Sequence, residues 1–310
     1  MKFMDRYPGI RTALEVSGVT IPELRAMFDR ILATYDELAP ALPDAMGWKR
    51  QKPAHARHCA AEASEFAPVL GFNELERAYF AIPISAHDMG RMIEGLRKCI
   101  KPDAPENLRV TLPDGFRERW PVINQPERMH GADSAELLMP ILGPFAETRI
   151  GEWTLRAVAL HSDKDNPALE VAGGAPEALA LCNILRDLDK VEGFREAKDY
   201  VGNPERKARE RLQNWPQQVQ RDPLWGMELG RIDPEDALDS FCNGQAIDRS
   251  KSRSYERYML QYLAWAFNIV QPEMLELALH EGGPQTVAAY LRKRLEVSPD
   301  QAARLLAKLQ

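Results

Sequence analysis

The chain has 310 residues, of which 45% are hydrophobic and 28% are charged, an ordinary composition for a globular protein with a sizeable core. The formal net charge of −6 gives no overall attraction to nucleic acid or to an anionic membrane surface. The four cysteines lie far apart and form no CxxC pair, which argues against a zinc finger or a disulfide scaffold and fits a reducing compartment.

Targeting and anchoring signals are not evident in the sequence. Residues 1–6 lack the apolar stretch of a signal peptide, and no run approaches the ~18 apolar residues of a membrane span. We therefore expect a cytoplasmic protein without membrane or nucleic-acid partners. A homo-oligomer is compatible with the sequence.

Residues 1–53 are predicted to form an N-terminal helical segment. The sequence Thr-Ile-Pro-Glu at 20–23 is a capping box with proline just inside the helix start. Apolar residues then recur at helical spacing through residue 32. Three prolines and a glycine mark residues 39–53 as a connection between helices.

Residues 54–200 are predicted to form the core, which is rich in helical patterns. The alanine-rich stretch 54–70 ends at Gly71, a typical C-terminal cap. The next helix starts at Asn73, and its apolar positions continue to residue 86. His87 and Asp88 follow directly, and a buried His-Asp pair requires polar partners or a metal ion.

The helical rhythm breaks at about residues 106–122. Alternating sequences at 108–112 and 116–120 flank a Pro-Asp-Gly turn signal, so we predict a small β-hairpin inserted between helices. Such an insertion is compatible with a lid over a site, with an oligomer contact or with simple decoration.

Helical patterns return after this insertion and continue to the end of the chain. Helices are predicted over residues 130–138, 152–161 and 176–192. Residues 201–310 are predicted to form a C-terminal helical extension that packs on the core. It contains a buried apolar helix at 258–270, a helix that starts near residue 298, and basic runs at 206–211 and 249–253. Acidic neighbours indicate that these basic runs are a solvated face. The sequence as a whole predicts an all-α protein.

Residues suited to metal binding recur along the predicted core at intervals of roughly one helix-turn-helix each. They are His58, His87, Asp88, His130, His161 and Asp189. Imidazole and carboxylate together suit Fe, Mn or Zn, and helix bundles gather such ligands from several helices. The other two of the six histidines, His55 and His280, lie outside this series and are interpreted as surface residues.

Five segments carry a resemblance to a known family. They are Ala56–Ala60 around His58, the apolar-His-Asp-x-Gly-Arg segment Ile84–Arg91, the His-Gly-x-x-Ser-Ala-Glu segment His130–Glu136, His161–Ser162, and Arg186–Lys190. In this order they resemble the HD superfamily of metal-dependent phosphohydrolases over about residues 54–195. The departures are Met89, Leu188 and Arg91, where lysine is frequent, and none of them removes a ligand.

The resemblance implies an HD-type helical bundle with a divalent metal centre. His58, His87, Asp88 and Asp189 would hold a first ion. Asp88 would bridge to a second ion held by His130 and His161. Fe or Mn is expected, and Mg, Ni or Zn is compatible with the same ligands. Ser134 and Asp187 are interpreted as partners that orient the ligating imidazoles.

The implied activity is hydrolysis of a phosphomonoester or phosphodiester, with a nucleotide or a cyclic dinucleotide as the expected substrate. Asp88, Arg91 and Lys164 are the candidate catalytic residues, the last two as phosphate-binding cations. Arg91 is also compatible with charge pairing at a helix end, and Lys164 with a solvated lysine. Two alternatives stay open: a mixed-valent di-iron oxygenase with the same ligands, and a signalling module that binds a nucleotide without turnover.

Overall fold

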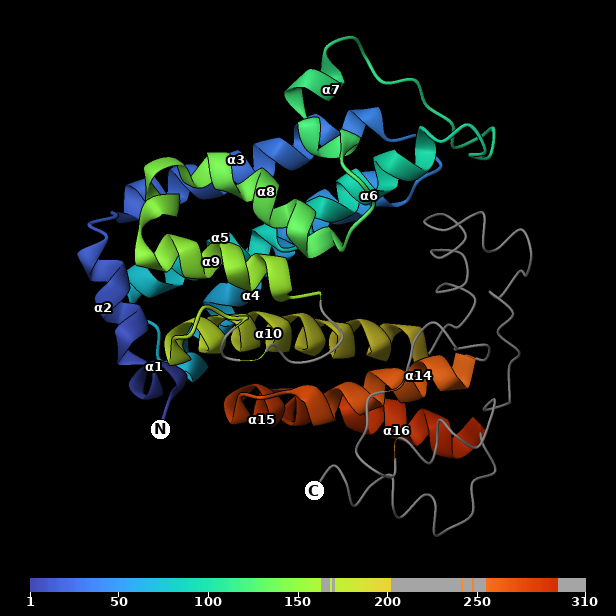
Figure 1. Cartoon of the computed structure of the whole chain (residues 1–310). Helices are drawn as coiled ribbons and strands as arrows, with labels where there is room; N and C mark the ends of the chain where they lie inside the picture. Colours follow the sequence, from blue (N-terminus) through green and yellow to red (C-terminus); the bar gives the residue numbers. More distant parts are fainter. Residues whose placement is uncertain (163–167, 169–170, 202–240, 242–246, 248–254, 295–310) are drawn as a thin grey trace. The chain divides into compact units, whose positions relative to one another are not determined.

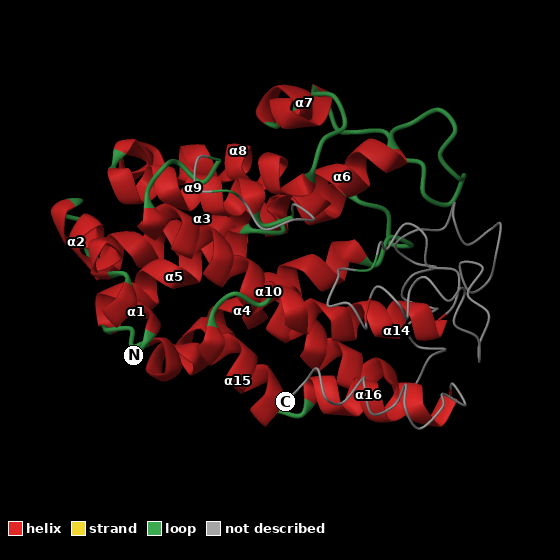
Figure 2. Ribbon diagram, turned by 60° about the horizontal axis from the view of Figure 1, so that its bottom comes forward, coloured by secondary structure: helices red, strands yellow, loops and turns green. Residues whose placement is uncertain are grey.

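The computed structural model describes residues 1–162, 168, 171–201, 241, 247 and 255–294 (Figure 1). All elements in these residues are α-helices or short 3₁₀ helices, so the predicted all-α class is confirmed (Figure 2). The chain divides into two compact units, Met1–Arg186 and Asp187–Gln310, whereas the predicted boundaries lay at 53/54 and 200/201. Among the described helices, none combines the length and the apolar character needed to cross a bilayer.

The elements follow one another in this order: α1 (Phe3–Arg6), α2 (Pro8–Val16), α3 (Ile21–Leu38), η1 (Ala39–Ala41), α4 (Trp48–Leu70), α5 (Glu74–Ala86), α6 (Met89–Cys99), α7 (Phe116–Arg119), η2 (Pro121–Asn124), α8 (His130–Leu142), η3 (Gly143–Glu147), α9 (Arg149–Leu160), α10 (Pro176–Val201), α14 (Tyr255–Ala264), η5 (Trp265–Asn268), α15 (Pro272–His280) and α16 (Gly283–Arg294).

Local sequence signals set the starts and ends of several helices in the first unit. At the start of α3 the Thr20 hydroxyl accepts the N–H of Glu23 at 3.4 Å, and the Glu23 carboxylate accepts the N–H of Thr20 at 2.8 Å. Asn73 and Glu76 form the same reciprocal box at the start of α5. Gly71 ends α4 with a φ of 79°, in the left-handed region that only glycine enters without strain. The predicted helix starts at Thr20 and Asn73 and the predicted helix end at Gly71 are therefore confirmed.

Helix α4 is longer than the sequence predicted. It begins at Trp48 and includes residues 48–53, which were predicted to belong to a connection. Pro53 lies near the helix start, where its missing N–H removes a single main-chain hydrogen bond and leaves the preceding turn in place. The extra turn matters because it carries Lys52, which faces the functional cluster described below.

The predicted β-hairpin at about 106–122 is wrong. Residues 108–112 form no strand, and Phe116–Arg119 form the short helix α7. The turn itself was predicted correctly, since Gly115 has a φ of 74°. The residues after the turn, 117–119, are Arg-Glu-Arg, which favour helix over strand, and this preference outweighs the alternation of apolar and polar residues.

The centre of the first unit is built from α3, α4, α5, α6, α8 and α9. Within it α5 packs against α3 and α4, α6 packs against α8, and α8 packs against α9. Figures 1 and 2 show these helices side by side in both views. Buried apolar side chains fill the space between them, among them Ile31, Phe66, Tyr79, Ile93 and Leu138.

The second unit has its own apolar core. Met259, Leu260 and Leu263 from α14 pack with Val287 and Leu291 from α16. The predicted buried helix at 258–270 is therefore confirmed, as α14 followed by η5. The helix predicted near residue 298 and the two basic runs lie outside the described residues.

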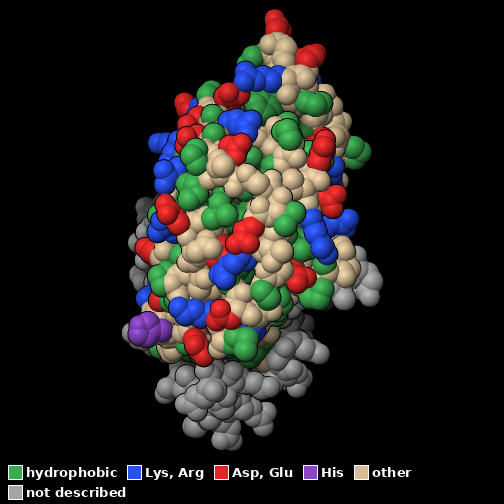
Figure 3. Space-filling view, turned by 90° about the vertical axis from the view of Figure 1, so that its left-hand side faces the viewer, with side chains coloured by type: hydrophobic (Ala, Val, Ile, Leu, Met, Phe, Trp, Pro, Cys, Tyr) green, Lys and Arg blue, Asp and Glu red, His purple; other side chains and the backbone are tan. Residues whose placement is uncertain are grey.

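Surface charge is mixed on the face of the molecule shown in Figure 3. Lysine and arginine side chains are interspersed there with aspartate and glutamate, and apolar side chains are scattered among them. Charges of alternating sign cancel over short distances, so this face presents no strong field of a single sign.

Candidate metal centre

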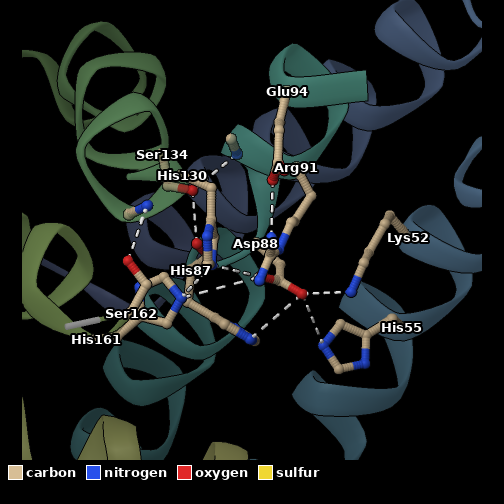
Figure 4. Close-up of polar contacts among 12 residues, drawn as sticks. Lys52, His55, His87, Asp88, Arg91, Glu94, His130, Ser134, His161 and Ser162 are labelled. Carbon is tan, nitrogen blue, oxygen red and sulfur yellow. Dashed lines mark hydrogen bonds and ion pairs between the residues drawn. The ribbon is translucent and has the colours of Figure 1, made fainter. Parts of the chain in front are cut away.

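The His-Asp pair lies at the junction of two helices. His87 is the residue that follows α5, and Asp88 is the residue that precedes α6. Both side chains are buried. Because a carboxylate out of water requires cations or hydrogen-bond donors, Asp88 needs polar neighbours. Figure 4 shows them approaching from α4, α6, α8 and α9.

Three of the predicted imidazoles lie beside the Asp88 carboxylate. His130, the first residue of α8, has its Nε2 3.2 Å from Asp88 Oδ1, and His161, which follows α9, has its Nε2 3.9 Å from the same oxygen. These two Nε2 atoms are 3.0 Å apart. The Nε2 of His87 is 3.9 Å from Asp88 Oδ2. The predicted residues His87, Asp88, His130 and His161 therefore form one buried cluster, although they are far apart in sequence.

The tautomers of two imidazoles are determined by the ends of their helices. The Nδ1 of His87 is 2.5 Å from the carbonyl oxygen of Ile84, and the Nδ1 of His161 is 2.7 Å from that of Val158. A carbonyl oxygen only accepts hydrogen bonds, so each Nδ1 carries the proton and each neutral ring keeps a lone pair on Nε2. The last carbonyls of a helix have no partner within the helix, which explains why both rings bind there. Imidazoles that ligate metals are commonly oriented in this way.

Helix α4 contributes His55 to the cluster in place of the predicted His58. The Nε2 of His55 is 3.7 Å from Asp88 Oδ2, and its side chain is 13% exposed. The side chain of His58 is 60% exposed and lies 3.2 Å from the carboxylate of Glu62, one helical turn further on. The interpretation of His55 as a surface residue is therefore wrong, and the structure does not bring His58 into the cluster.

The periodicity of α4 could have identified His55. Cys59, Ala63 and Phe66 are buried and define the inner face of this helix. His55 precedes Cys59 by four residues, so the two side chains lie on the same face, whereas His58 is rotated away from it. The family-like segment around His58 took no account of this face, so it did not point to His55.

Cys59 extends the cluster along α4. Its buried Sγ is 3.5 Å from the Nε2 of His55. Two overlapping groups, His55 with Cys59 and His87, and His87 with Asp88 and His161, each offer ligand atoms within 4.8 Å of one another. These buried side chains can therefore hold a metal ion.

Two cations flank the Asp88 carboxylate. The Nζ of Lys52 on α4 is 2.5 Å from Oδ2, a contact that the sequence did not indicate. The Nε of Arg91 on α6 is 3.7 Å from Oδ1. Arg91 also donates to the carboxylate of Glu94 at 2.7 Å, and Lys98 donates to the other oxygen of Glu94 at 2.6 Å. The predicted position of Arg91 beside the cluster agrees with this geometry.

Ser134 positions His87 through the main chain. Its hydroxyl donates to the carbonyl oxygen of His87 at 2.5 Å and accepts the N–H of Gly90 at 2.7 Å. The prediction that Ser134 orients an imidazole is thus wrong for the ring itself, because the contact is with the backbone. A comparable contact lies just after α9, where the hydroxyl of Ser162 accepts the N–H of Gly131 at 3.3 Å.

Two glycines allow the helices that carry the cluster to approach closely. A Cβ atom at Gly90 would lie 2.0 Å from the carbonyl oxygen of His130, and one at Gly131 would lie 2.4 Å from that of Ala159. Real contacts of a Cβ are longer than 3.0 Å, so neither position has room for a side chain. The approach of α6 to α8, and of α8 to α9, depends on these two residues.

A buried ion pair anchors the first turn of α8. Arg97 donates to both carboxylate oxygens of Asp133, at 2.6 and 3.1 Å, and Arg128 donates to the same carboxylate at 2.6 Å. Arg97 also donates to the carbonyl oxygen of Val122 at 2.5 Å. This bidentate geometry holds the start of α8, and with it His130, against α6.

The electrostatics of the cluster favour an ionised Asp88 carboxylate. Burial by itself raises the pKa of the Asp88 carboxyl, but the neighbouring side chains of Lys52, His87, His130 and His161 hold that pKa well below its ordinary value. Burial, together with the nearby charge of Arg91, lowers the pKa of His130 to about 4. His130 is therefore neutral at pH 7, the form in which an imidazole binds metals.

The remaining predicted residues lie elsewhere. Lys164 lies outside the described residues. Asp189 is exposed on the part of α10 that belongs to the second unit, and its assignment as a ligand stays a prediction. Asp187, interpreted as a partner of the imidazoles, accepts the N–H groups of Val270 and Gln271, at 3.0 and 2.7 Å, within the second unit.

Comparison with known proteins gives no relative. None of the protein families, curated proteins or solved structures compared with the chain matches it. The chemistry of the cluster therefore has to be argued from its own residues, which are a buried carboxylate, four imidazoles, a thiol and two flanking cations.

Proposed function

We propose that the chain is a metal-dependent phosphohydrolase of the HD superfamily, with its metal centre at Asp88. The observation that carries the proposal is the fixed tautomer of His87 and His161, which leaves their Nε2 lone pairs on the side of the Asp88 carboxylate. Neutral imidazole nitrogens and a carboxylate are ligands typical of Fe, Mn and Zn in helix bundles.

The arrangement supports two ions that share Asp88. His55 and His87 face one carboxylate oxygen, at 3.7 and 3.9 Å, and His130 and His161 face the other, at 3.2 and 3.9 Å. We propose that His55, His87 and Asp88 would hold one ion and that His130, His161 and Asp88 would hold a second, with Fe or Mn as the metal. His55 takes the role predicted for His58.

The residues around the ligands suit an anionic substrate. Such ions, when bound, supply hydroxide near neutral pH and neutralise charge on phosphoryl oxygens. The guanidinium of Arg91, 3.7 Å from Asp88 Oδ1 and partly exposed, can donate to a phosphoryl oxygen from outside the ligand set. We propose a phosphomonoester or phosphodiester of a nucleotide as the substrate, hydrolysed with the ester oxygen as the leaving atom.

Metal analysis of matched variants tests the proposal. Wild-type protein prepared with Fe or Mn is expected to hold about two ions per chain, and His130→Ala combined with His161→Ala about one. His55→Ala is expected to lower the metal content, while His58→Ala, one helical turn away on the same helix, keeps the wild-type content. Equal losses in His55→Ala and His58→Ala would contradict the assignment of His55.

An activity panel then tests the reaction. The metal-loaded protein is assayed on p-nitrophenyl phosphate, bis(p-nitrophenyl) phosphate, nucleoside monophosphates and cyclic dinucleotides. Release of phosphate or p-nitrophenol that depends on added metal and is lost in Asp88→Asn supports the proposal. Metal-loaded protein that hydrolyses none of these esters would refute it, and oxygen uptake by an iron-loaded sample would instead favour the di-iron oxygenase.

A further inference from the structure

Lys52 lies closer to the Asp88 carboxylate than any of the four imidazoles described above. Its Nζ is 2.5 Å from Oδ2, whereas the imidazole nitrogens lie between 3.2 and 3.9 Å from the two oxygens. In Figure 4, Lys52 and His55 approach Asp88 together from α4, on the side opposite His130 and His161. The lysine is therefore part of the cluster, and not merely near it.

The contact of Lys52 with Oδ2 competes with the role proposed for the Asp88 carboxylate. Oδ2 also faces His55 and His87, which are the proposed ligands of one ion. A divalent cation on Oδ2 would repel an ammonium held at the same oxygen, since like charges a few ångströms apart interact strongly away from bulk water. Such an ion would therefore favour movement of the ammonium away from Oδ2.

Positive side chains gather at this carboxylate. Lys52 and Arg91 both form ion pairs with Asp88, from α4 and α6. Lysine binds phosphate as a compact point charge on a flexible stem, which allows it to move from Oδ2 to a nearby phosphoryl oxygen.

We propose that Lys52 binds the phosphoryl group of the ligand in this site, in the role that the sequence assigned to Lys164. It pairs with Asp88 in the absence of ligand and donates to a phosphoryl oxygen when the site is loaded. Arg91 and Lys52 would then contact the phosphoryl group from α6 and α4, on the two sides of Asp88. This inference deepens the proposed function and rests on it for the presence of metal.

The test is a titration of inorganic phosphate into the full-length protein, followed by calorimetry, with and without added Mn²⁺. Lys52→Met is expected to raise the Kd for phosphate about tenfold or more, as loss of one charge-assisted hydrogen bond should. Lys52→Arg, which keeps the charge, is expected to retain most of the affinity and to show that the site is still folded. The matched control is Lys49→Met on the same helix, because Lys49 pairs with the exposed Asp44 instead, at 2.7 Å.

The outcomes separate this inference from the proposed function. Protein that binds Mn²⁺ and phosphate, with a Kd unchanged in Lys52→Met, would overturn the role of Lys52 alone. Protein that binds Mn²⁺ but no phosphate would overturn it as well. A Lys52-dependent phosphate affinity in protein that binds no metal would support the anion site and refute the metal-dependent reaction.

Discussion

Replacement of Gly90 by alanine should disturb the metal centre without touching any ligand. The new Cβ would lie 2.0 Å from the carbonyl oxygen of His130, and ordinary contact begins near 3.4 Å, so α6 and α8 would have to separate by more than 1 Å. Overpacking of this kind costs about 1–3 kcal/mol. Loss of the Gly90–Ser134 hydrogen bond adds about 1 kcal/mol, and the better helix propensity of alanine offsets about 1 kcal/mol. We expect a net loss of about 1–3 kcal/mol in the free energy of unfolding.

The matched control for this change is Gly95→Ala on the same helix. A Cβ at Gly95 would lie 3.2 Å from the side-chain ends of Leu42 and Trp48, which can shift by a few tenths of an ångström. We expect Gly95→Ala to stay within about 1 kcal/mol of wild type, because the gain in helix propensity offsets the crowding.

Urea unfolding and metal content together measure the effect. Gly90→Ala should lower the urea midpoint and weaken metal binding, since His130 moves with α8 away from Asp88, whereas Gly95→Ala should leave metal binding unchanged. Gly90→Ala protein with wild-type stability and wild-type metal content would show that α6 and α8 are not held as closely as described here.

The remaining predictions concern acid and the buried carboxylates. In metal-free protein, stability should fall as the pH drops from about 6.5 towards 4, because the unfolded state protonates His130 while the folded state keeps it neutral; the loss reaches about 3 kcal/mol. Urea midpoints at pH 7.5, 5.5 and 4.5 check this loss, and an unchanged pH dependence in His130→Ala would be the contrary result. The depressed pKa of Asp88 acts in the same direction only below its ordinary value, so a further midpoint at about pH 3 checks its effect. Asp133→Ala leaves Arg97 buried without its carboxylate and should cost about 3–5 kcal/mol, which chemical denaturation would measure; a cost below about 1 kcal/mol would contradict the buried pair. Asp187→Asn removes the negative charge that accepts two backbone N–H groups. The variant should have a lower thermal midpoint and an unchanged metal content. A lower metal content in this variant would instead support the prediction that Asp187 orients an imidazole of the metal centre.

Local rules in the sequence predicted most of the helices. Capping residues at Thr20, Asn73 and Gly71 act over three or four neighbouring residues, so they can be interpreted without knowledge of the tertiary fold. The alternation at 108–112 and 116–120 failed because a hairpin needs two strands that pair, and the Arg-Glu-Arg sequence of the second stretch favours a helix.

The candidate site was predicted only in part. His87, Asp88, His130 and His161 were correctly placed in one cluster, since each lies at the end of a helix whose apolar face is visible in the sequence. The assignment failed where it depended on the rotation of a helix, because His55 and not His58 lies beside the inner face of α4. Lys52 could not be predicted, since its contact with a carboxylate on another helix has no local signal.

The start of α6 is completed by another helix. Asp88 is the N-cap residue of α6, yet its carboxylate makes no capping hydrogen bond, and the free N–H of Gly90 in the first turn is accepted by Ser134 of α8. The first turn of α6 therefore lacks this capping partner until α8 has docked. Docking of α8 also brings His130 next to Asp88. The start of α6 at Asp88 and the approach of His130 to Asp88 therefore form together, in one cooperative step. A chain in which α8 has frayed would lose helix structure at Asp88 at the same time, so partly assembled forms of the centre should be scarcely populated.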